Sequence, residues 1–203
     1  MPTIVTPIII LLPTIVLAYL LGSVPFGLIV ARLFGLPDPR SIGSGNIGAT
    51  NVLRAGSKPA AFLTVLLDGA KGGLAVVVAR LVAGEDAAQF AALSAFIGHL
   101  FPIWLGFKGG KGVATLLGTL VALLPVLGLI ALLSWLFGYF VFRYSSLSAL
   151  LSAAVTPFVA YFQGHTSYLI LLILMAALVW WRHRENIKRL FNGDEPMVDW
   201  SKR

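Results

Sequence analysis

The chain has 203 residues, of which 58% are hydrophobic and only 11% are charged. A soluble domain carries about 25% charged residues, so this composition excludes an ordinary soluble protein and indicates a membrane protein. The net charge of +7 would suggest a nucleic-acid partner only in a soluble chain, and the lack of cysteine excludes disulfides and thiolate chemistry.

Six apolar stretches in the sequence are candidates for membrane spans, since a bilayer core of ~30 Å takes roughly 20 helical residues. In chain order they are Ile8–Phe34, Ala60–Val82, Ala88–Phe107, Val113–Phe142, Leu147–Phe162 and Ser167–Trp181. The first lacks a basic segment before it, so we expect an uncleaved span and not a signal peptide. The sequence therefore predicts an all-α, polytopic membrane helix bundle. We expect a single domain over residues 1–203, with a polar tail at 193–203.

The fourth stretch is too long for one span. At about 1.5 Å per residue, Val113–Phe142 covers ~45 Å. Pro125 lies near its middle, and proline pushes the preceding Leu124 away from the helical conformation. The stretch is therefore either one kinked, tilted helix or two shorter helices joined by a tight turn.

The distribution of basic residues favours two crossings. All but two of the 15 Lys and Arg residues lie in four segments: Arg32–Lys58, Lys108–Lys111, Arg143 and Arg182–Arg203. If the fourth stretch crosses twice, all four segments fall on one face, as the positive-inside rule expects. We therefore predict seven transmembrane helices, with the N-terminus outside and the C-terminus in the cytoplasm. A single kinked span is the alternative.

A glycine-rich stretch in the first predicted cytoplasmic loop has the features of an anion site. It reads Gly43-Ser44-Gly45-Asn46-Ile47-Gly48-Ala49-Thr50-Asn51 and is followed by Arg54. The glycines allow consecutive backbone N–H groups to form an anion-binding concavity, and Arg54 would add a bidentate phosphate contact. A flexible loop is the plain alternative, although Ile, Ala and Asn are atypical of a solvated linker.

A second glycine-rich stretch, Phe107-Lys108-Gly109-Gly110-Lys111-Gly112, directly precedes the fourth apolar stretch. A glycine-rich loop that leads into a helix N-terminus favours anion binding, because unpaired N–H groups and the helix dipole both point at the ligand. The spacing is not that of a Walker A loop. Anchoring at the membrane surface would explain the two lysines but not the three glycines.

The last predicted span ends in Trp181-Arg182-His183-Arg184-Glu185-Asn186. His183 and Asn186 are three residues apart, so they share a helix face and both can donate to a ligand oxygen. The arginines are equally explained by contacts with lipid headgroups. Together, three phosphate-competent segments on one predicted face indicate an anionic ligand reached from the cytoplasm.

Asp68 and Lys71 lie three residues apart inside the second predicted span. Charges there are costly unless they are paired or functional, so the sequence leaves open a structural ion pair and a role in the site. Neighbouring glycines, namely Gly69, Gly72 and Gly73, would let another helix approach closely. His99 is a candidate base, although a capping or packing role is the stronger expectation.

These segments resemble the bacterial acyl-phosphate:glycerol-3-phosphate acyltransferases. The matching blocks are G-S-G-N-I-G-A-T-N…R, L-L-D-G-A-K-G, G-H-L-F-P-x-W-x-G-F-K-G-G-K-G-V-A-T and R-H-R-E-N, and the resemblance runs from about Tyr19 to Asn192. It implies a seven-helix membrane fold without metal or cofactor. It also implies transfer of an acyl group from acyl phosphate to the 1-hydroxyl of glycerol 3-phosphate, giving 1-acyl-glycerol 3-phosphate in phospholipid biosynthesis. We expect a monomer in the bacterial inner membrane, with its site facing the cytoplasm and no nucleic-acid partner.

The resemblance also implies a mechanism and residue roles. Substrate assistance is implied, in which a phosphate of the substrates takes the hydroxyl proton and no side chain acts as general base. The residues implied to hold the two phosphates are Ser44, Arg54, Lys111, His183 and Asn186, joined by Ser146 or Ser148. Further substrate contacts are expected from Gly45, Asn46, Thr50, Asn51, Lys108, Gly109, Gly110 and Gly112. Structural roles are expected for Asp68, Lys71 and Glu185.

One negative observation agrees with an acyl phosphate donor. The H-x₄-D dyad that activates the hydroxyl in other glycerolipid acyltransferases is missing, since the residues five positions after the three histidines are Trp104, Ile170 and Lys188. An acyl phosphate has a good leaving group, so positioning and charge stabilisation can supply much of the rate. A transporter of organic phosphates is the competing class, but it would need more polar residues inside the spans than Asp68 and Lys71. A lipid-binding scaffold would give no reason for the glycine-rich loops.

Overall fold

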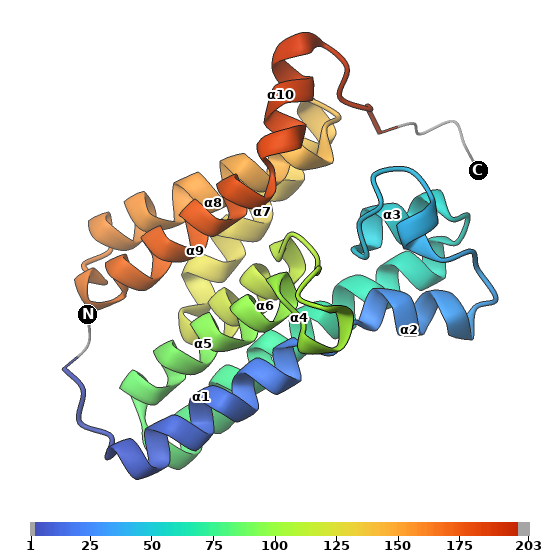
Figure 1. Ribbon diagram of the computed structural model, residues 1–203. Helices are drawn as coiled ribbons and strands as arrows, with labels where there is room; N and C mark the ends of the chain where they lie inside the picture. The colour runs from blue at the N-terminus through green and yellow to red at the C-terminus, as the bar shows by residue number, and fades with distance from the viewer. Residues whose placement is uncertain (1–2, 199–203) are drawn as a thin grey trace. The chain divides into compact units, whose positions relative to one another are not determined.

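The computed structural model describes residues 3–198, and every regular element in that range is a helix (Figure 1). The predicted all-α class is therefore confirmed for this part of the chain. The end of the predicted polar tail, with the basic residues Lys202 and Arg203, lies outside the described residues. Contacts divide the described chain into two compact units, residues 3–124 and residues 125–198.

The first unit is built around one long helix. Its elements are α1 (Ile8–Gly22), α2 (Phe26–Leu33), η1 (Pro39–Ser41), α3 (Ala49–Arg54), α4 (Lys58–Ala83), α5 (Glu85–Leu100), η2 (Ile103–Leu105) and α6 (Val113–Leu123). Helix α4 contacts α1, α2, α3, α5 and α6, and Figure 1 shows α1, α4 and α5 side by side. The first predicted span is broken before Pro25, which precedes the first residue of α2.

Small residues let the helices of the first unit approach backbone to backbone. A Cβ added to Gly22 of α1 would lie 2.0 Å from the carbonyl oxygen of Ala95 in α5. On α4, a Cβ at Gly72 would lie 2.9 Å from the carbonyl oxygen of Thr115 in α6, and one at Gly118 of α6 would lie 2.0 Å from that of Gly69. The expectation that the glycines beside Asp68 admit another helix is confirmed, and that helix is α6.

The fourth apolar stretch consists of two helices and not of one kinked helix, as we predicted from Pro125 and the basic residues. Helix α6 ends at Leu123 and α7 (Pro125–Val141) begins at the proline. Arg80 of α4 donates to the carbonyl oxygens of Ala122 and Leu123, at 2.6 and 3.1 Å, and pairs with Glu85 at 2.7 Å. These bonds satisfy carbonyls that the last turn of α6 leaves unpaired.

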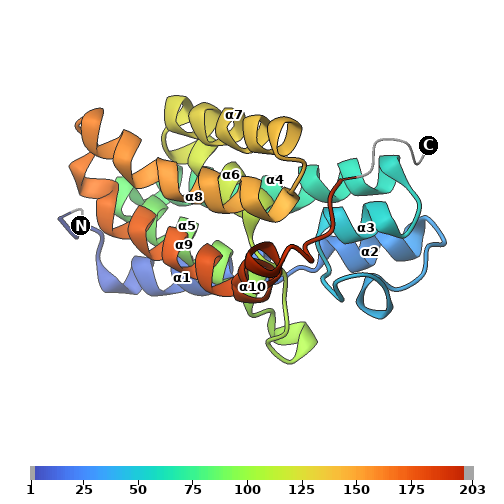
Figure 2. The ribbon, with the colours of Figure 1, turned by 90° about the horizontal axis from the view of Figure 1, so that it is seen from above.

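The second unit contains α7, α8 (Ser145–Phe162), η3 (Thr166–Tyr168), α9 (Leu169–Arg182) and α10 (Arg184–Asn192). Helix α8 contacts α7, α9 and α10, and Figure 2 shows it between α7 and α9. Ser152 of α8 donates to the carbonyl oxygen of Ala131 in α7 at 2.7 Å, which ties these two helices together. Helices α9 and α10 form a pair bent by 58°.

Several helices have the length and composition of membrane spans. Four pass that test: Ile8–Leu33 (α1 and α2 taken together), Lys58–Ala83, Glu85–Leu105 and Ser145–Phe162. The bent pair of α9 and α10 adds a fifth, whereas α6 and α7 are shorter apolar helices. Large hydrophobic side chains such as Leu81 and Phe162 are more than three-quarters exposed, as expected for a surface that faces lipid. The number of crossings and the orientation stay predictions.

Candidate functional site

The first glycine-rich loop is shaped by the side chain of Asn51. The Asn51 amide nitrogen donates to the carbonyl oxygens of Pro39 and Ile42, and its Oδ1 accepts the N–H of Ser44 at 3.3 Å. Only 1% of Asn51 is exposed. The Asn51 amide therefore holds the loop in shape. The sequence predicted a substrate contact for Asn51 but not this structural role.

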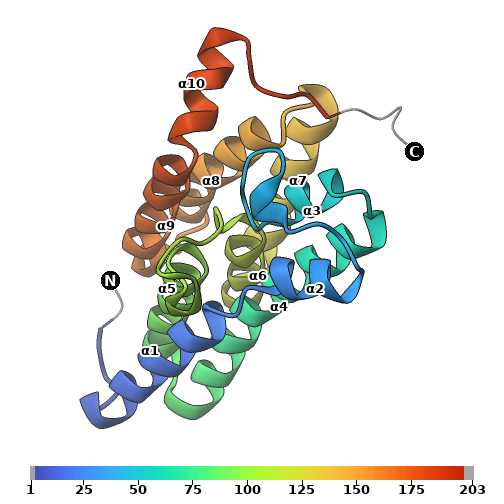
Figure 3. The ribbon, with the colours of Figure 1, turned by 45° about the vertical axis from the view of Figure 1, so that its right-hand side comes forward.

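Helix α2 supports this loop from below, and Figure 3 shows α2, α3 and α4 together in this part of the first unit. A Cβ at Gly27 of α2 would lie 1.8 Å from the carbonyl oxygen of Ile47. In the loop itself Gly43 has a φ of +51°, and a Cβ there would lie 3.1 Å from Cδ of Arg54. Arg54 therefore lies beside Gly43, the residue before Ser44. Arg54 and Ser44 are both exposed.

The second glycine-rich loop is fixed to the end of α5. The N–H groups of Gly109 and Gly110 donate to the carbonyl oxygens of Leu100 and His99, both at 3.1 Å. The turn before them needs positive φ values at Gly106 and, unusually, at Phe107. The backbone of this loop is therefore held by defined hydrogen bonds.

Packing against α5 gives a physical reason for the glycines of the second loop. A Cβ at Gly109 would lie 2.2 Å from the carbonyl oxygen of His99, and one at Gly110 would lie 2.1 Å from Nε2 of His99. A Cβ at Gly112 would lie 2.3 Å from the ring of Phe96. Gly112 is also the residue before α6 and has no side chain to cap it, so the first N–H groups of α6, next to Lys111, suit an anion.

Asp68, Lys71 and His99 form a buried polar cluster beneath the second loop. The Lys71 ammonium lies 2.7 Å from Oδ1 of Asp68 and 3.0 Å from Nδ1 of His99, and it donates to the carbonyl oxygen of Val24 at 2.8 Å. Each of the three side chains is at most 5% exposed. The pairing of Asp68 with Lys71, one of the two alternatives that the sequence left open, is present, and His99 is its neighbour.

In the second unit, a carboxylate that the sequence analysis did not single out holds the predicted site residues. Oε1 of Glu195 accepts hydrogen bonds from Ser146 Oγ and from Asn186 Nδ2, both at 2.6 Å. Its Oε2 accepts from Nε of Arg189 at 2.8 Å. The only sequence signal for this arrangement was Gly193, which ends α10 in the left-handed conformation and turns the chain back.

The two candidate serines have different surroundings. Ser148 is fully buried and donates at 2.8 Å to the carbonyl oxygen of Tyr144, the residue before α8, next to Gly138 of α7. Ser146 is instead linked to Asn186 through the carboxylate of Glu195. Of the two, Ser146 is therefore the better candidate for a ligand contact.

His183 lies at the bend between α9 and α10, and only 3% of it is exposed. Its Nδ1 is 2.8 Å from the carbonyl oxygen of Val179. Because a carbonyl can only accept, Nδ1 carries a proton, and a neutral ring has its lone pair on Nε2. Glu185, for which a structural role was expected, is exposed, and its ion pairs with Lys188 at 3.5 Å and Arg184 at 3.7 Å are surface contacts of a kind that contribute little to stability.

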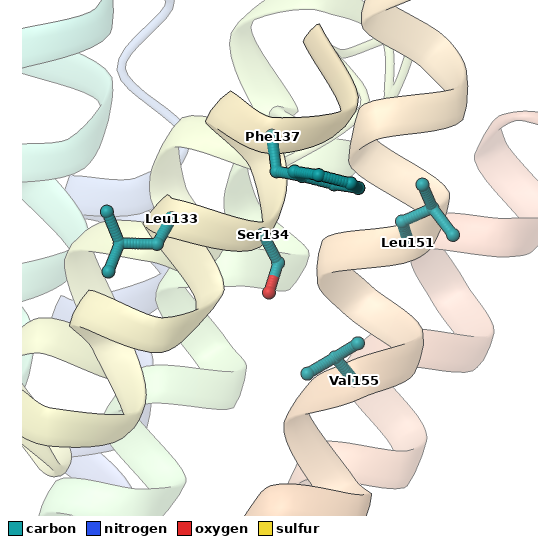
Figure 4. A pocket seen from close by; sticks show the side chains of 5 residues that line it. All are labelled: Leu133, Ser134, Phe137, Leu151 and Val155. Atoms are coloured by element: carbon teal, nitrogen blue, oxygen red, sulfur yellow. The ribbon is translucent and has the colours of Figure 1, made fainter. Parts of the chain in front are cut away.

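An apolar groove of about 360 Å³ lies between α7 and α8. It is lined by Leu133, Ser134, Phe137, Leu151 and Val155 (Figure 4). A groove of this kind suits an alkyl chain, whether of a bilayer lipid or of an acyl substrate. Within residues 3–198, no three His, Asp or Glu side chains come together as a metal site would require.

Comparisons with known proteins identify sequences and structures similar to this chain. The family described as glycerol-3-phosphate acyltransferase matches residues 12–193. A glycerol-3-phosphate acyltransferase of Jannaschia sp. (strain CCS1) is 56% identical over 197 residues, which are 97% of each chain. That of Dinoroseobacter shibae is 56% identical over 186 residues, covering 92% of each chain.

Two solved structures are also similar. One is an integral membrane glycerol 3-phosphate acyltransferase in its glycerol 3-phosphate form, with a TM-score of 0.88 and 40% identity, covering 93% of this chain and 96% of that one. The other is a lysophosphatidic acid form, with a TM-score of 0.87 and 38% identity, covering 95% and 97%. The similarity thus extends over nearly the whole length of the chain.

Proposed function

Because the chain belongs to the glycerol-3-phosphate acyltransferase family of membrane proteins, we propose that it transfers an acyl group from acyl phosphate to the 1-hydroxyl of glycerol 3-phosphate. The products are lysophosphatidic acid and phosphate, in phospholipid biosynthesis. The observation that carries this proposal is the likeness to solved relatives in a glycerol 3-phosphate form and in a lysophosphatidic acid form, which correspond to acceptor and acylated product.

The surroundings of the histidines support acyl phosphate as the donor. An H-x₄-D dyad is missing from the sequence, and His99 is engaged by Lys71 inside the first unit. A donor with a poor leaving group would need a strong base, whereas phosphate is a good leaving group and relieves that need. Positioning and charge stabilisation can then provide most of the acceleration.

Each unit offers its own group of phosphate contacts. In the first unit, we assign phosphate binding to Ser44, Arg54, Lys111 and the N-terminus of α6. In the second, we assign it to His183, Asn186 and Ser146. The guanidinium of Arg54 suits bidentate binding, and helix N-termini bind anions through free N–H groups.

The chemical step is substrate-assisted. The 1-hydroxyl oxygen of glycerol 3-phosphate forms a bond to the acyl carbon while a phosphate oxygen of the substrates takes its proton. The bond from the acyl carbon to the phosphate oxygen then breaks, and phosphate leaves with the electron pair. Cationic groups such as Arg54 and Lys111 stabilise the charge that develops during transfer.

The proposed enzyme has seven crossings, with its site facing the cytoplasm. The four long apolar helices and the bent pair supply five crossings, and α6 and α7 supply two more. The break at Pro125 supports this count, because it lets the fourth apolar stretch cross twice. With both crossings, the basic segments lie on the cytoplasmic side. We place the protein in the bacterial inner membrane, as a monomer.

The test is to incubate the purified protein in detergent with palmitoyl phosphate and glycerol 3-phosphate and to detect lysophosphatidic acid by mass spectrometry. We expect product from palmitoyl phosphate and essentially none from palmitoyl-CoA. Comparable rates with the thioester would contradict the donor assignment. If neither donor gives product, uptake of labelled glycerol 3-phosphate into proteoliposomes tests the alternative of a phosphate transporter.

A further inference from the structure

The buried cluster of Asp68, Lys71 and His99 is not among the groups assigned to phosphate. Its position joins three parts of the first unit. Asp68 and Lys71 belong to α4, His99 is near the end of α5, and the Val24 carbonyl lies in the break between α1 and α2. The Lys71 ammonium is in hydrogen-bond contact with the Val24 carbonyl oxygen at 2.8 Å and with Nδ1 of His99 at 3.0 Å, and it forms an ion pair with Oδ1 of Asp68 at 2.7 Å.

These contacts fix the orientation of the His99 ring. An ammonium can only donate, so Nδ1 of His99 accepts from Lys71, and the ring edge that bears Nε2 is directed elsewhere. That edge lies against Gly110, where an added Cβ would be 2.1 Å from Nε2. The carbonyl oxygen of His99 also accepts the N–H of Gly110 at 3.1 Å. Both the ring and the backbone of His99 therefore hold the second glycine-rich loop.

We propose that His99, held by the Lys71–Asp68 ion pair, is a positioning residue that sets the second glycine-rich loop for phosphate binding. The Lys71 ammonium holds the His99 ring because it contacts Nδ1 of His99 at 3.0 Å and is itself held by Asp68 and by the Val24 carbonyl. The ring and the backbone of His99 then fix the position of Gly110, which adjoins Lys111 and the start of α6. This inference rests on the proposed function, since it presumes that the loop binds a substrate phosphate.

A positioning role and a purely structural role predict different kinetics. Loss of a structural contact lowers the fraction of folded enzyme, so the apparent kcat falls and the KM of the remaining molecules stays the same. A displaced phosphate loop instead weakens substrate binding in every folded molecule, so KM rises. A misplacement of about 1 Å can cost about 10²-fold in rate, and we expect a displaced phosphate loop to raise KM by a smaller factor.

The experiment compares two alanine variants at opposite ends of α5. His99→Ala removes the contact with the loop. Asp86→Ala is the matched control, because Asp86 is equally buried but accepts hydrogen bonds from Thr6 and Val5 in the N-terminal segment. Both should lower the unfolding temperature in detergent. Only His99→Ala should raise the KM for glycerol 3-phosphate, by about tenfold or more.

Two conservative variants refine the test. His99→Gln keeps a polar group near the position of Nε2, whereas His99→Asn keeps an acceptor near that of Nδ1 and leaves Gly110 unsupported. We expect the KM of His99→Gln to lie closer to that of the parent. The double variant Asp68→Asn/Lys71→Met removes both charges together, which avoids an unpaired buried ion, and it should raise KM as His99→Ala does.

A further variant separates this inference from the proposed function. If Lys111→Met raises the KM for glycerol 3-phosphate but His99→Ala leaves it within twofold of the parent, the loop binds phosphate and the positioning role is wrong. If Lys111→Met also leaves both substrate KM values unchanged, the assignment of the loop to phosphate fails instead. Calorimetric titration with glycerol 3-phosphate alone gives the same comparison without turnover.

Discussion

The carboxylate of Glu195 accepts a hydrogen bond from the side-chain amide of Asn186 at 2.6 Å, and the same oxygen accepts one from Ser146. Two residues assigned to phosphate are thus held in place by one side chain. Glu195→Gln keeps a carbonyl oxygen but removes the charge that binds Arg189. We expect it to lower the unfolding free energy by about 1.5–3 kcal/mol, the range for hydrogen bonds to charged groups. Thermal unfolding in detergent measures this, with the exposed Glu185→Gln as a control expected within about 0.5 kcal/mol of the parent.

The stabilisation by Glu195 should depend on pH. Burial by itself raises the pKa of the Glu195 carboxyl, but hydrogen bonds from Ser146, Asn186 and Arg189 outweigh burial and hold the pKa below its ordinary value of 4.5. A group whose pKa is lowered by folding adds stability above its unfolded pKa and loses it as pH falls through the folded pKa. The difference in stability between the parent and Glu195→Gln should therefore be constant near neutral pH and shrink below about 4.5. A difference that grows on acidification would contradict this account.

The crossing of α4 and α6 should be sensitive to alanine in an asymmetric way. At Gly118 a Cβ would lie 2.0 Å from the backbone of α4, whereas at Gly69 the nearest atom of α6 would be 3.4 Å away. Gly118→Ala should therefore destabilise the protein by about 1–3 kcal/mol or more, as overpacking does, and Gly69→Ala should cost much less. Unfolding temperatures of the two variants measure the difference. Equal temperatures would show that the helices can separate at little cost.

Two substitutions distinguish substrate assistance from a protein base. His183→Asn should retain measurable activity if His183 only binds phosphate, because Asn can still donate a hydrogen bond. Loss of a true base should cost roughly 10²–10⁴-fold, together with the acidic limb of the pH profile. Arg54→Lys should be badly impaired, because lysine lacks the planar fork that binds phosphate bidentately. We would measure kcat/KM against pH for both variants and the parent. An inactive His183→Asn beside a nearly normal Arg54→Lys would identify His183 as the base, for which its Nε2 lone pair is suited.

Cysteine labelling in intact cells tests the seven-crossing topology. Thr3→Cys and Gln163→Cys should react with an impermeant thiol reagent from outside, and Lys58→Cys should not. All three positions are exposed. They suit cysteine better than the turn glycines Gly56, Gly84 and Gly164, whose positive φ values would strain any residue with a Cβ. Labelling of Lys58→Cys alone would show that the orientation is opposite to the predicted one. Labelling of Thr3→Cys without Gln163→Cys would indicate a single crossing by α6 and α7.

The sequence predicted what depends on periodicity and local chemistry. Long apolar stretches gave the helices, Pro125 gave the break after α6, and glycines beside Asp68 predicted a close helix contact. Contacts between distant residues were not predictable in this way. Gly193 indicates a turn after α10 but not that Glu195 reaches Ser146, and nothing near Lys71 indicates its contact with the Val24 carbonyl, because such pairs form only when helices pack.

Some residue types also have two explanations that sequence alone cannot separate. The glycines of the second loop fit a phosphate loop, yet His99 and Phe96 occupy the space that their Cβ atoms would need. Asn51 fits a ligand contact, yet its amide is bonded to the carbonyls of Pro39 and Ile42. In both cases the second explanation depends on residues that are distant in the sequence and close in the fold, so the local sequence could not indicate it.

The contact between Thr115 and Asp68 has a consequence for depth in the bilayer. Thr115, in the first turn of α6, donates to the carbonyl oxygen of Asp68 at 2.9 Å. Asp68 lies about 15 Å along α4 from Lys58, the first residue of that helix. From Asp68 to the far end of α4 only ~23 Å remain, less than the ~30 Å of the hydrocarbon core. With α4 upright and its far end at one boundary of the hydrocarbon core, Thr115 lies ~7 Å inside the other boundary, which is the cytoplasmic one in the proposed topology. In the proposed reaction, an acyl phosphate dissolved in the membrane would present its reactive carbonyl at that level while its chain stays among the lipid tails. On the same proposal, glycerol 3-phosphate is the substrate that would have to travel, from the water down to the start of α6.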